Sequence, residues 1–419
     1  MNTMKIGFSK TDITPPAGIA LGGYAGYRPC SGTHDPLYCK AVLLEQDATR
    51  YALVALDLLC TDEALYQQIG EAISPLGITQ ERLIVSAIHT HAAPQGVLAG
   101  EGPLAAVNCS AQESTPEFRA YIKNVIRKAV EACTAAADQL EAFVVRGGKG
   151  TTPPVGSERH TGKAPGGDLS VIQCRTESGR LLTLYNFPCH PTVLGPDNLL
   201  ASADFAAGIE SIIGGSMAVF LNGAAGDIST RFTRRESTFE ECSRMSKIAA
   251  EHILAALGDA PFLPPEPMKG KQITVSLKPR PVETVEAAQA ELQSRTAQWE
   301  SAQAAGADSA TLRMLKTYVE GAWVNLEFSK TLAGIRRLVL PVTLFRFAGM
   351  EFATIPGELF STLQPEGLSI IAYANGYFRY LCPEEAYESN HYEAMAAIVA
   401  RGGGEQLIGE IQKARHELY

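Results

Sequence analysis

The feature that most constrains the fold is an order of strands and one helix that the sequence repeats three times. Each unit has two apolar strands joined by a short polar turn, then a helical stretch, then another apolar strand. The strands are 41–46, 51–57 and 82–89 in the first unit, 169–175, 181–187 and 217–223 in the second, and 342–348, 351–356 and 368–376 in the third. Short turns join antiparallel neighbours, whereas a helix returns the chain to a parallel strand. The sequence therefore predicts an α/β fold with a mixed β-sheet core of three strand-strand-helix-strand units and flanking helices.

A stretch rich in Ala, Gln and Glu separates the second unit from the third. Residues 282–335 have helical periodicity with one break at Gly306-Ala307-Asp308, which predicts a helical hairpin. We expect an insertion packed on the sheet, in preference to a lid or an oligomerisation arm. Residues 1–281 and 336–419 would then form a single α/β domain.

The composition excludes several classes of protein. With 419 residues, 46% of them hydrophobic and 19% charged, the chain is globular and can bury a large core. A net charge of -9 without a long basic run argues against nucleic acid as a partner. The start has no apolar leader and no stretch is long and apolar enough to span a bilayer, so we expect a cytoplasmic protein without integral membrane contact. The nine scattered cysteines are expected to be reduced. The oligomeric state is not determined by the sequence.

Two histidines stand where the first unit's returning strand gives way to a loop. In His89-Thr90-His91 the imidazoles are two residues apart, so an extended chain directs both to the same side. Imidazole suits zinc, iron or copper. The alternative is that both histidines are solvated loop residues without a metal. The residue types at the other predicted strand ends decide between these two interpretations.

Residues of metal-binding or catalytic type recur at these ends. The further candidates are Asp57, His190, Asp227, Glu358, Asn375 and Tyr380. Ligands of open α/β sheets bind beyond the carboxyl ends of the strands, so a site is predicted there. Asp57 has the alternative of capping the following helix. His190 lies in the stiff apolar segment 186–191, which favours a functional role.

Several ordered segments resemble the neutral/alkaline, non-lysosomal ceramidases. HTHAAPQG is similar to the family's HTHSGPGG segment, NGAAGDIST to its GDVSPN segment and IPGELF to its PGE segment. YFRYLCPEEAYESNHYEA resembles its Y-V-T-T-x-E-E-Y…Y-E-G stretch, and IGFSKTDITPP, GGYA and GTHDPLYCKA resemble its opening. The resembling segments lie between Ile6 and Glu393 and so cover most of the chain.

The resemblance implies a zinc amidase that cleaves an N-acyl bond. Carried over by position, it makes His89, His190, Glu358 and Tyr380 the zinc ligands, with iron or manganese fitting the nitrogen and oxygen donors nearly as well. It makes Ser229 a nucleophile or a polar partner of the substrate, of which we favour the second, and it places Arg159 and Tyr392 around the scissile amide.

Two more residues receive roles from their positions. His91 is expected to orient a ligand, to shuttle a proton or to bind the metal itself. Asp227 is expected to hold the second nitrogen of a histidine.

The expected function is hydrolysis of an N-acyl amide by metal-activated water. GDISTR and HTHAAPQG depart from the family segments, and the family's C-terminal β-sandwich domain is expected to be absent. These departures, with the arginines at 159, 231, 234 and 235, predict a small-molecule N-acyl substrate that is smaller and more polar or anionic than ceramide. A metal-dependent esterase or lactonase with the same site is the alternative, and a non-catalytic metal-binding protein is a weaker one.

Overall fold

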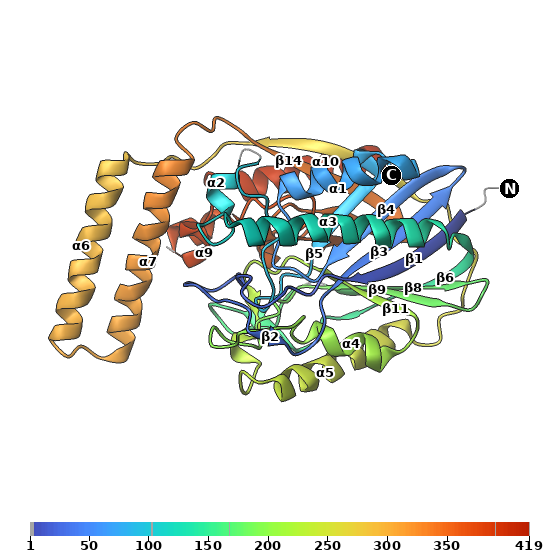
Figure 1. Cartoon of the computed structure of the whole chain (residues 1–419), viewed down its shortest axis with the longest axis horizontal. Helices are drawn as coiled ribbons and strands as arrows, with labels where there is room; N and C mark the ends of the chain where they lie inside the picture. Colours follow the sequence, from blue (N-terminus) through green and yellow to red (C-terminus); the bar gives the residue numbers. More distant parts are fainter. Residues whose placement is uncertain (1–3, 102–103, 167, 390, 419) are drawn as a thin grey trace.

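Two β-sheets lie face to face at the centre of the computed structural model, which describes residues 4–101, 104–166, 168–389 and 391–418 (Figure 1). Within these residues the larger sheet has eight strands, in the spatial order β11 (Met217–Asn222), β9 (Leu181–Phe187), β8 (Asp168–Thr176), β6 (Glu141–Thr151), β1 (Met4–Asp12), β3 (Tyr38–Gln46), β4 (Thr49–Leu56) and β5 (Leu83–Ala87). The smaller sheet has the order β13 (Lys269–Leu277), β14 (Leu338–Phe347), β15 (Met350–Thr354) and β17 (Leu368–Ile371).

The predicted units are present in these sheets. In each unit the first two strands pair antiparallel and the second strand pairs parallel with the returning one: β3, β4 and β5, then β8, β9 and β11, then β14, β15 and β17. The α/β fold with mixed sheets and flanking helices is therefore confirmed. The first two units share the larger sheet, where β1 and β6 join them, because β1 pairs with β3 on one side and with β6 on the other.

The third unit differs from the prediction in two respects. It forms the smaller sheet with β13 and does not extend the larger one. The only helical element in its described crossover is the 3-10 turn η4 (Ser361–Leu363), and its last strand ends at Ile371, five residues before the predicted end. Tyr373 and Asn375 have φ angles of 55° and 63°, outside the β region, so the strand cannot continue through them.

Side chains of the larger sheet alternate between its two faces, and each face contributes to a separate hydrophobic cluster. In β3, Leu43 belongs to the cluster under the helices, whereas Leu44 belongs to the cluster between the sheets. The helices on the outer face are α1 (Glu63–Ile73), α3 (Pro116–Ala137), α4 (Ala206–Ile213) and α5 (Phe239–Leu257). Asp62, Thr115 and Thr238 cap the first, second and fourth of these with side-chain oxygens.

The other face of the larger sheet packs on the smaller sheet. Ile6 and Leu221 share a cluster with Phe347 and Phe352, and α10 (Gly403–Leu418) covers the far side of the smaller sheet. The molecule thus has four layers, with helices outside and sheets inside. A cavity of about 570 Å³ remains between the sheets, and it is lined mainly by apolar side chains.

A helical hairpin stands out from this body (Figure 1). It consists of α6 (Val285–Ala304) and α7 (Ser309–Thr331), which lie against each other along their length. Phe328 and Val324, near the end of α7, belong to the cluster of the smaller sheet. The predicted helices are therefore present, whereas the division of the chain into a domain and an insertion stays a prediction. Among the described helices, none has the length and apolar character needed to cross a bilayer.

The remaining elements are short and lie in the loops. They are the helices α2 (Ala105–Asn108), α8 (Glu384–Glu388) and α9 (Tyr392–Met395), the 3-10 turns η1 (Ser74–Leu76), η2 (Gln80–Arg82) and η3 (Thr230–Phe232), and the paired strands β2 (Gly32–Thr33) with β10 (Leu200–Ala201), β7 (Ser157–Glu158) with β12 (Ile228–Ser229), and β16 (Glu358–Leu359) with β18 (Tyr380–Leu381).

Candidate metal centre and active site

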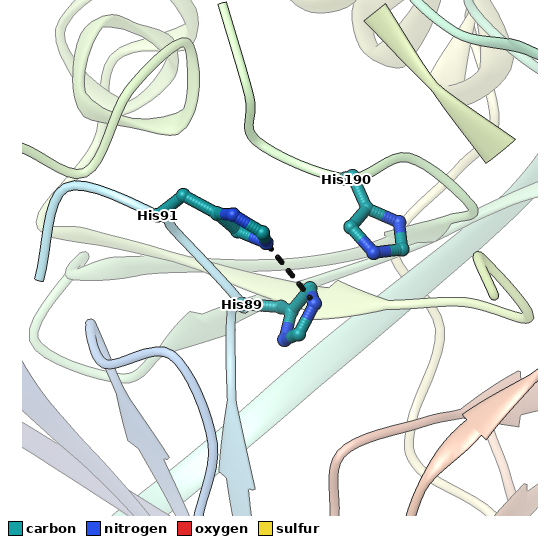
Figure 2. A group of neighbouring side chains, drawn as sticks. All are labelled: His89, His91 and His190. Carbon is teal, nitrogen blue, oxygen red and sulfur yellow. Dashed lines mark hydrogen bonds between the residues drawn. The ribbon is translucent and has the colours of Figure 1, made fainter. Parts of the chain in front are cut away.

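Three imidazoles meet where strands of the first two units end. Figure 2 shows His89 and His91, from the loop after β5, facing His190, from the loop after β9. The Nε2 atoms of His89 and His91 are 3.4 Å apart, and the ring centroids of His89 and His190 are 4.5 Å apart. One ring nitrogen of each histidine lies within 4.8 Å of the others. The strand ends therefore bring together the three histidines that the sequence singled out.

Backbone carbonyls fix the orientation of two of these rings. His89 Nδ1 is 2.7 Å from the carbonyl oxygen of Leu59, and His190 Nδ1 is 2.9 Å from that of Ile228. A carbonyl only accepts, so both Nδ1 atoms carry the proton and donate it. Burial lowers the pKa of His190 to about 3, so this ring is neutral. Its Nε2 atom therefore presents a bare lone pair to the centre of the cluster.

Glu358, from β16, completes this group of ligand atoms. Its Oε2 atom lies 3.1 Å from His190 Nε2 and 3.4 Å from His89 Nε2. Burial opposes ionisation of this carboxyl group, and a proton or cation shared with the two imidazoles is what holds its pKa well below the usual range. In the neutral His190 ring, which carries its proton on Nδ1, the Nε2 lone pair faces this carboxylate oxygen, and a cation between the two atoms would bind both. Ligand atoms about 2.0–2.1 Å from a tetrahedral zinc ion lie about 3.3 Å apart, so these donors fit the metal.

Tyrosines surround the carboxylate. Tyr380 pairs with Glu358 in the register of β16 and β18, so the two residues are neighbours across the strands. The hydroxyl of Tyr377 donates to Glu358 Oε1 at 2.5 Å, and the ring of Tyr373 stacks on His89 with centroids 4.0 Å apart. Sequence reasoning missed Tyr373 and Tyr377. The spacing of tyrosines at 373, 377 and 380 after a buried strand was the available signal.

The backbone is strained at the same place. His89 has a φ of 69°, and Tyr373, which stacks on it, has a φ of 55°. Non-glycine residues in this region cost on the order of 1 kcal/mol or more, and such residues cluster at functional sites. The strain is consistent with a site whose geometry the surrounding packing imposes.

His91 is held by the glycine-rich segment near the N-terminus. A Cβ atom on Gly23 would lie 2.3 Å from His91 Nδ1, so only glycine leaves room for the ring. Arg28 donates to the carbonyl oxygens of Gly22 and His91, at 2.9 Å each. Tyr24 meets the His91 ring edge-on, with centroids 4.9 Å apart. The GGYA segment therefore shapes the site through His91, since Gly23 leaves room for the ring and Tyr24 contacts its edge.

Arg159 and Glu393 lie beside the cluster. Arg159 follows β7, and its guanidinium donates to the hydroxyl of Tyr380 at 3.5 Å and to Glu393 Oε1 at 3.1 Å. Tyr392, at the start of α9, meets the ring of Tyr380 edge-on with centroids 6.3 Å apart and is 41% exposed. The predicted residues Arg159, Tyr380 and Tyr392 are therefore gathered on one side of the site, with the exposed Tyr392 at its outer edge.

Two residues of the GDIST segment have structural partners. Ser229 forms a β-bridge with His190, and its hydroxyl accepts the backbone N–H of Arg231 at 3.4 Å. No histidine in the described part of the chain hydrogen-bonds to this hydroxyl. The expectation that Asp227 holds a histidine is corrected, since its carboxylate accepts the backbone N–H and hydroxyl of Ser361, and carbonyls serve both histidines instead.

Asp57 and Asn375, which also stand at strand ends, lie outside the cluster. The carboxylate of Asp57 accepts the backbone N–H of Tyr38 at 2.9 Å, and the amide oxygen of Asn375 accepts that of Val85 at 2.8 Å. Both are buried and tie loops to strands. A polar residue at a strand end therefore has either role, and the sequence pattern does not separate them.

Comparison with known proteins agrees with this architecture. Residues 4–151 match the sequence model of the neutral/alkaline non-lysosomal ceramidase N-terminal region. The crystal structure of a neutral ceramidase from Pseudomonas aeruginosa superposes with a TM-score of 0.74 at 16% identity, covering 100% of this chain and 75% of that one. The N-terminal third of this chain therefore resembles the neutral/alkaline non-lysosomal ceramidases in sequence, and the whole chain resembles a solved ceramidase in fold.

A second solved structure and a sequence search complete the comparison. A ceramidase in complex with C2 superposes with a TM-score of 0.71 at 15% identity, covering 100% of this chain and 76% of that one. No curated protein sequence matches the chain. The likeness to the solved structures is therefore one of fold, and the residues of the site supply the argument for chemistry.

Proposed function

We propose that this chain is a member of the ceramidase family and a metal-dependent amidohydrolase whose metal is held by His89, His190, Glu358 and Tyr380. The observation that carries the proposal is the convergence of the Nε2 atoms of His190 and His89 on the buried Glu358 carboxyl group, at 3.1 and 3.4 Å. Two histidines and one carboxylate are a common catalytic zinc set, and zinc is the metal that we propose. Iron or manganese is an outcome that metal analysis would reveal.

When bound, the ion would polarise the carbonyl of the scissile bond and supply activated water. The chain's own residues then position the substrate. The guanidinium of Arg159 is held between Tyr380 and Glu393, so it is a fixed donor for the oxygen on which negative charge develops. Tyr392 lies at the outer edge, where its hydroxyl is available to the substrate. His91 is the candidate for moving a proton to the leaving nitrogen, because its Nε2 atom faces the proposed metal ligand His89.

Ser229 serves in this proposal as a polar partner of the substrate. Its hydroxyl faces a backbone N–H, and no general base within the described ranges hydrogen-bonds to it. A covalent serine mechanism needs such a base to activate the hydroxyl.

For the substrate we propose a small-molecule N-acyl amide that is smaller and more polar or anionic than ceramide. Arg231 supports this proposal because it is exposed and follows Ser229 by two residues. A cytoplasmic location goes with such a substrate and stays part of the proposal.

An esterase or lactonase would use the same residues, because only the leaving group differs. Purified protein should therefore be analysed for metals and tested on matched N-acyl amides and esters before and after chelation. Near-stoichiometric zinc with chelator-sensitive amide cleavage would support the proposal. Faster cleavage of the esters would favour the alternative, and absence of both bound metal and metal-restored activity would contradict both.

A further inference from the structure

A second group of metal-binding side chains lies on the far side of Arg159. It contains His160, His391 and Glu393, and one donor atom of each lies within 4.8 Å of the others. The residues come from two separate segments, the loop after β7 and the start of α9. None of these three side chains belongs to the proposed catalytic metal centre.

Glu393 connects the two groups. Its Oε1 atom accepts from Arg159 at 3.1 Å, and its Oε2 atom lies 3.1 Å from His160 Nε2. Burial opposes ionisation, but His160 and Arg159 lower the pKa of Glu393 to about 2. The carboxylate is therefore negatively charged at neutral pH. It directs Oε1 to Arg159 and Oε2 to His160.

His391 supplies a ring nitrogen that has no partner in the described part of the chain and is available to bind a metal ion. Its Nδ1 atom is buried and has no hydrogen-bond partner among the residues that the structure describes. Burial and the neighbouring His160 lower the pKa of His391, so its ring is neutral at physiological pH. A buried polar atom without a partner is costly, and a ligand that takes up its lone pair removes that cost.

The loop that carries His160 is held in place next to His391. Glu158 accepts the backbone N–H groups of His160 and Thr161, at 2.8 and 2.6 Å. The rings of His160 and His391 stack with centroids 3.6 Å apart and planes 9° apart. An imidazole binds an ion in its ring plane, so one ring must turn before both nitrogens meet the same ion. The side chain of His160 is 29% exposed and is the one free to turn.

We propose that His160, His391 and Glu393 form a second, weaker site for a divalent transition metal such as zinc. Two imidazoles and one carboxylate are a donor set that zinc accepts, with water as the remaining ligand. The site is expected to be weaker than the catalytic centre, because His160 must leave its stacked position before it binds. It lies within the reach of Arg159, so its occupation also changes the electrostatics of the proposed active site.

The consequence for activity follows from Glu393. An ion on Oε2 takes up negative charge that otherwise faces Arg159, and it places a second positive charge beside that guanidinium. Arg159 is then less firmly held against Tyr380. We expect excess metal to inhibit hydrolysis, and we expect this inhibition to be lost with the second site.

The decisive measurement is the number of metal ions bound by the metal-free full chain, by equilibrium dialysis against zinc and elemental analysis. The wild type should bind two equivalents, and His391→Ala should bind one, with the weaker dissociation constant raised at least tenfold. His160→Ala, which removes a partly exposed ring, should give the same result and guards against a folding defect in the first variant. His416→Ala, an exposed helix position outside both groups, is the matched control and should keep two equivalents.

The outcome does not depend on the proposed catalytic function. In Glu358→Gln the tighter equivalent should be lost, whereas the weaker one, which needs His391, should remain. A wild type that binds a single equivalent, which both His160→Ala and His391→Ala keep, overturns the second site, and so does full retention of two equivalents in both variants. If Glu358→Gln keeps both equivalents while His391→Ala loses one, the catalytic centre is contradicted and the second site stands.

Discussion

His190 Nε2 lies 3.1 Å from Glu358 Oε2, and His190 directs its other ring nitrogen, Nδ1, to the carbonyl oxygen of Ile228. The residues are 168 positions apart in the chain. A cation bound between the carboxylate oxygen and the imidazole nitrogen would be attracted to both atoms. Metal binding and stability should therefore be linked at this pair.

Glu358→Gln should abolish tight metal binding. The amide keeps the shape of the side chain but lacks the charge that a divalent ion requires. Elemental analysis after dialysis against a weak chelator should find less than a tenth of the wild-type content. Glu241→Gln is the control, because Glu241 is also a buried carboxylate but pairs with Arg244 outside the site. Equal metal content in wild type and Glu358→Gln would contradict the proposed centre.

Tyr377→Phe should weaken metal binding without removing it. The hydroxyl of Tyr377 donates to Glu358 Oε1 and fixes the carboxylate, and loss of such a supporting contact typically costs about 10–100-fold in metal affinity. Competition with a chromogenic chelator measures the change. Tyr387→Phe, whose hydroxyl donates to the carbonyl of Val399, should leave the affinity unchanged. An equal loss in both variants would indicate a general packing effect.

Gly23→Ala should displace His91. Gly23 has a φ of 89°, and Gly26 has a φ of 90° with nothing within 4 Å of an added Cβ, so alanine strains both backbones alike. Each substitution should cost on the order of 1 kcal/mol in the free energy of unfolding. Only Gly23→Ala adds the clash with the His91 ring, so it should also lower kcat for amide hydrolysis at least tenfold. If Gly26→Ala lowers kcat equally, the contact with His91 is not the cause.

Asp62→Asn should change how stability depends on pH. Burial raises the pKa of Asp62 from 3.8 to about 6, although its oxygens accept the backbone N–H groups of Leu65 and Leu98. Between these values the folded state binds more protons than the unfolded state. The contribution of Asp62 to the free energy of unfolding therefore falls as the pH rises from about 4 to 6, by on the order of 3 kcal/mol.

The asparagine variant lacks this titration. Urea unfolding of both metal-free proteins at several pH values should show the stability of the wild type, relative to the variant, decreasing over that range. A difference that is constant from pH 4 to 7 would show that Asp62 does not titrate as proposed.

Arg231→Ala should raise KM for anionic N-acyl substrates and leave neutral ones unaffected. The side chain is exposed and close in sequence to Ser229, so it is available for a substrate carboxylate. Arg127→Ala on the outer face of α3 makes the same change in net charge and serves as the control. A KM that is unchanged for anionic substrates would remove the support for that preference.

The sequence by itself determined the local pattern of the fold. Apolar strand segments, short polar turns and helical stretches predicted the three units, because these signals act between residues close in the chain. The HTH motif likewise predicted two histidines together at a strand end, although β5 stops at Ala87 and His89, with a φ of 69°, is not extended. Together with the family segments, this was enough to name every residue of the proposed metal centre.

Tertiary structure determined which distant parts of the chain are in contact with one another. Only folding could show that the third unit forms a separate sheet, because strand partners depend on packing between layers. The same holds for Asp227, whose carboxylate binds Ser361, and for Tyr377, which reaches Glu358. It also holds for His160 and His391, which stack across 231 residues of sequence. Such contacts follow from the three-dimensional path of loops, which no local periodicity encodes.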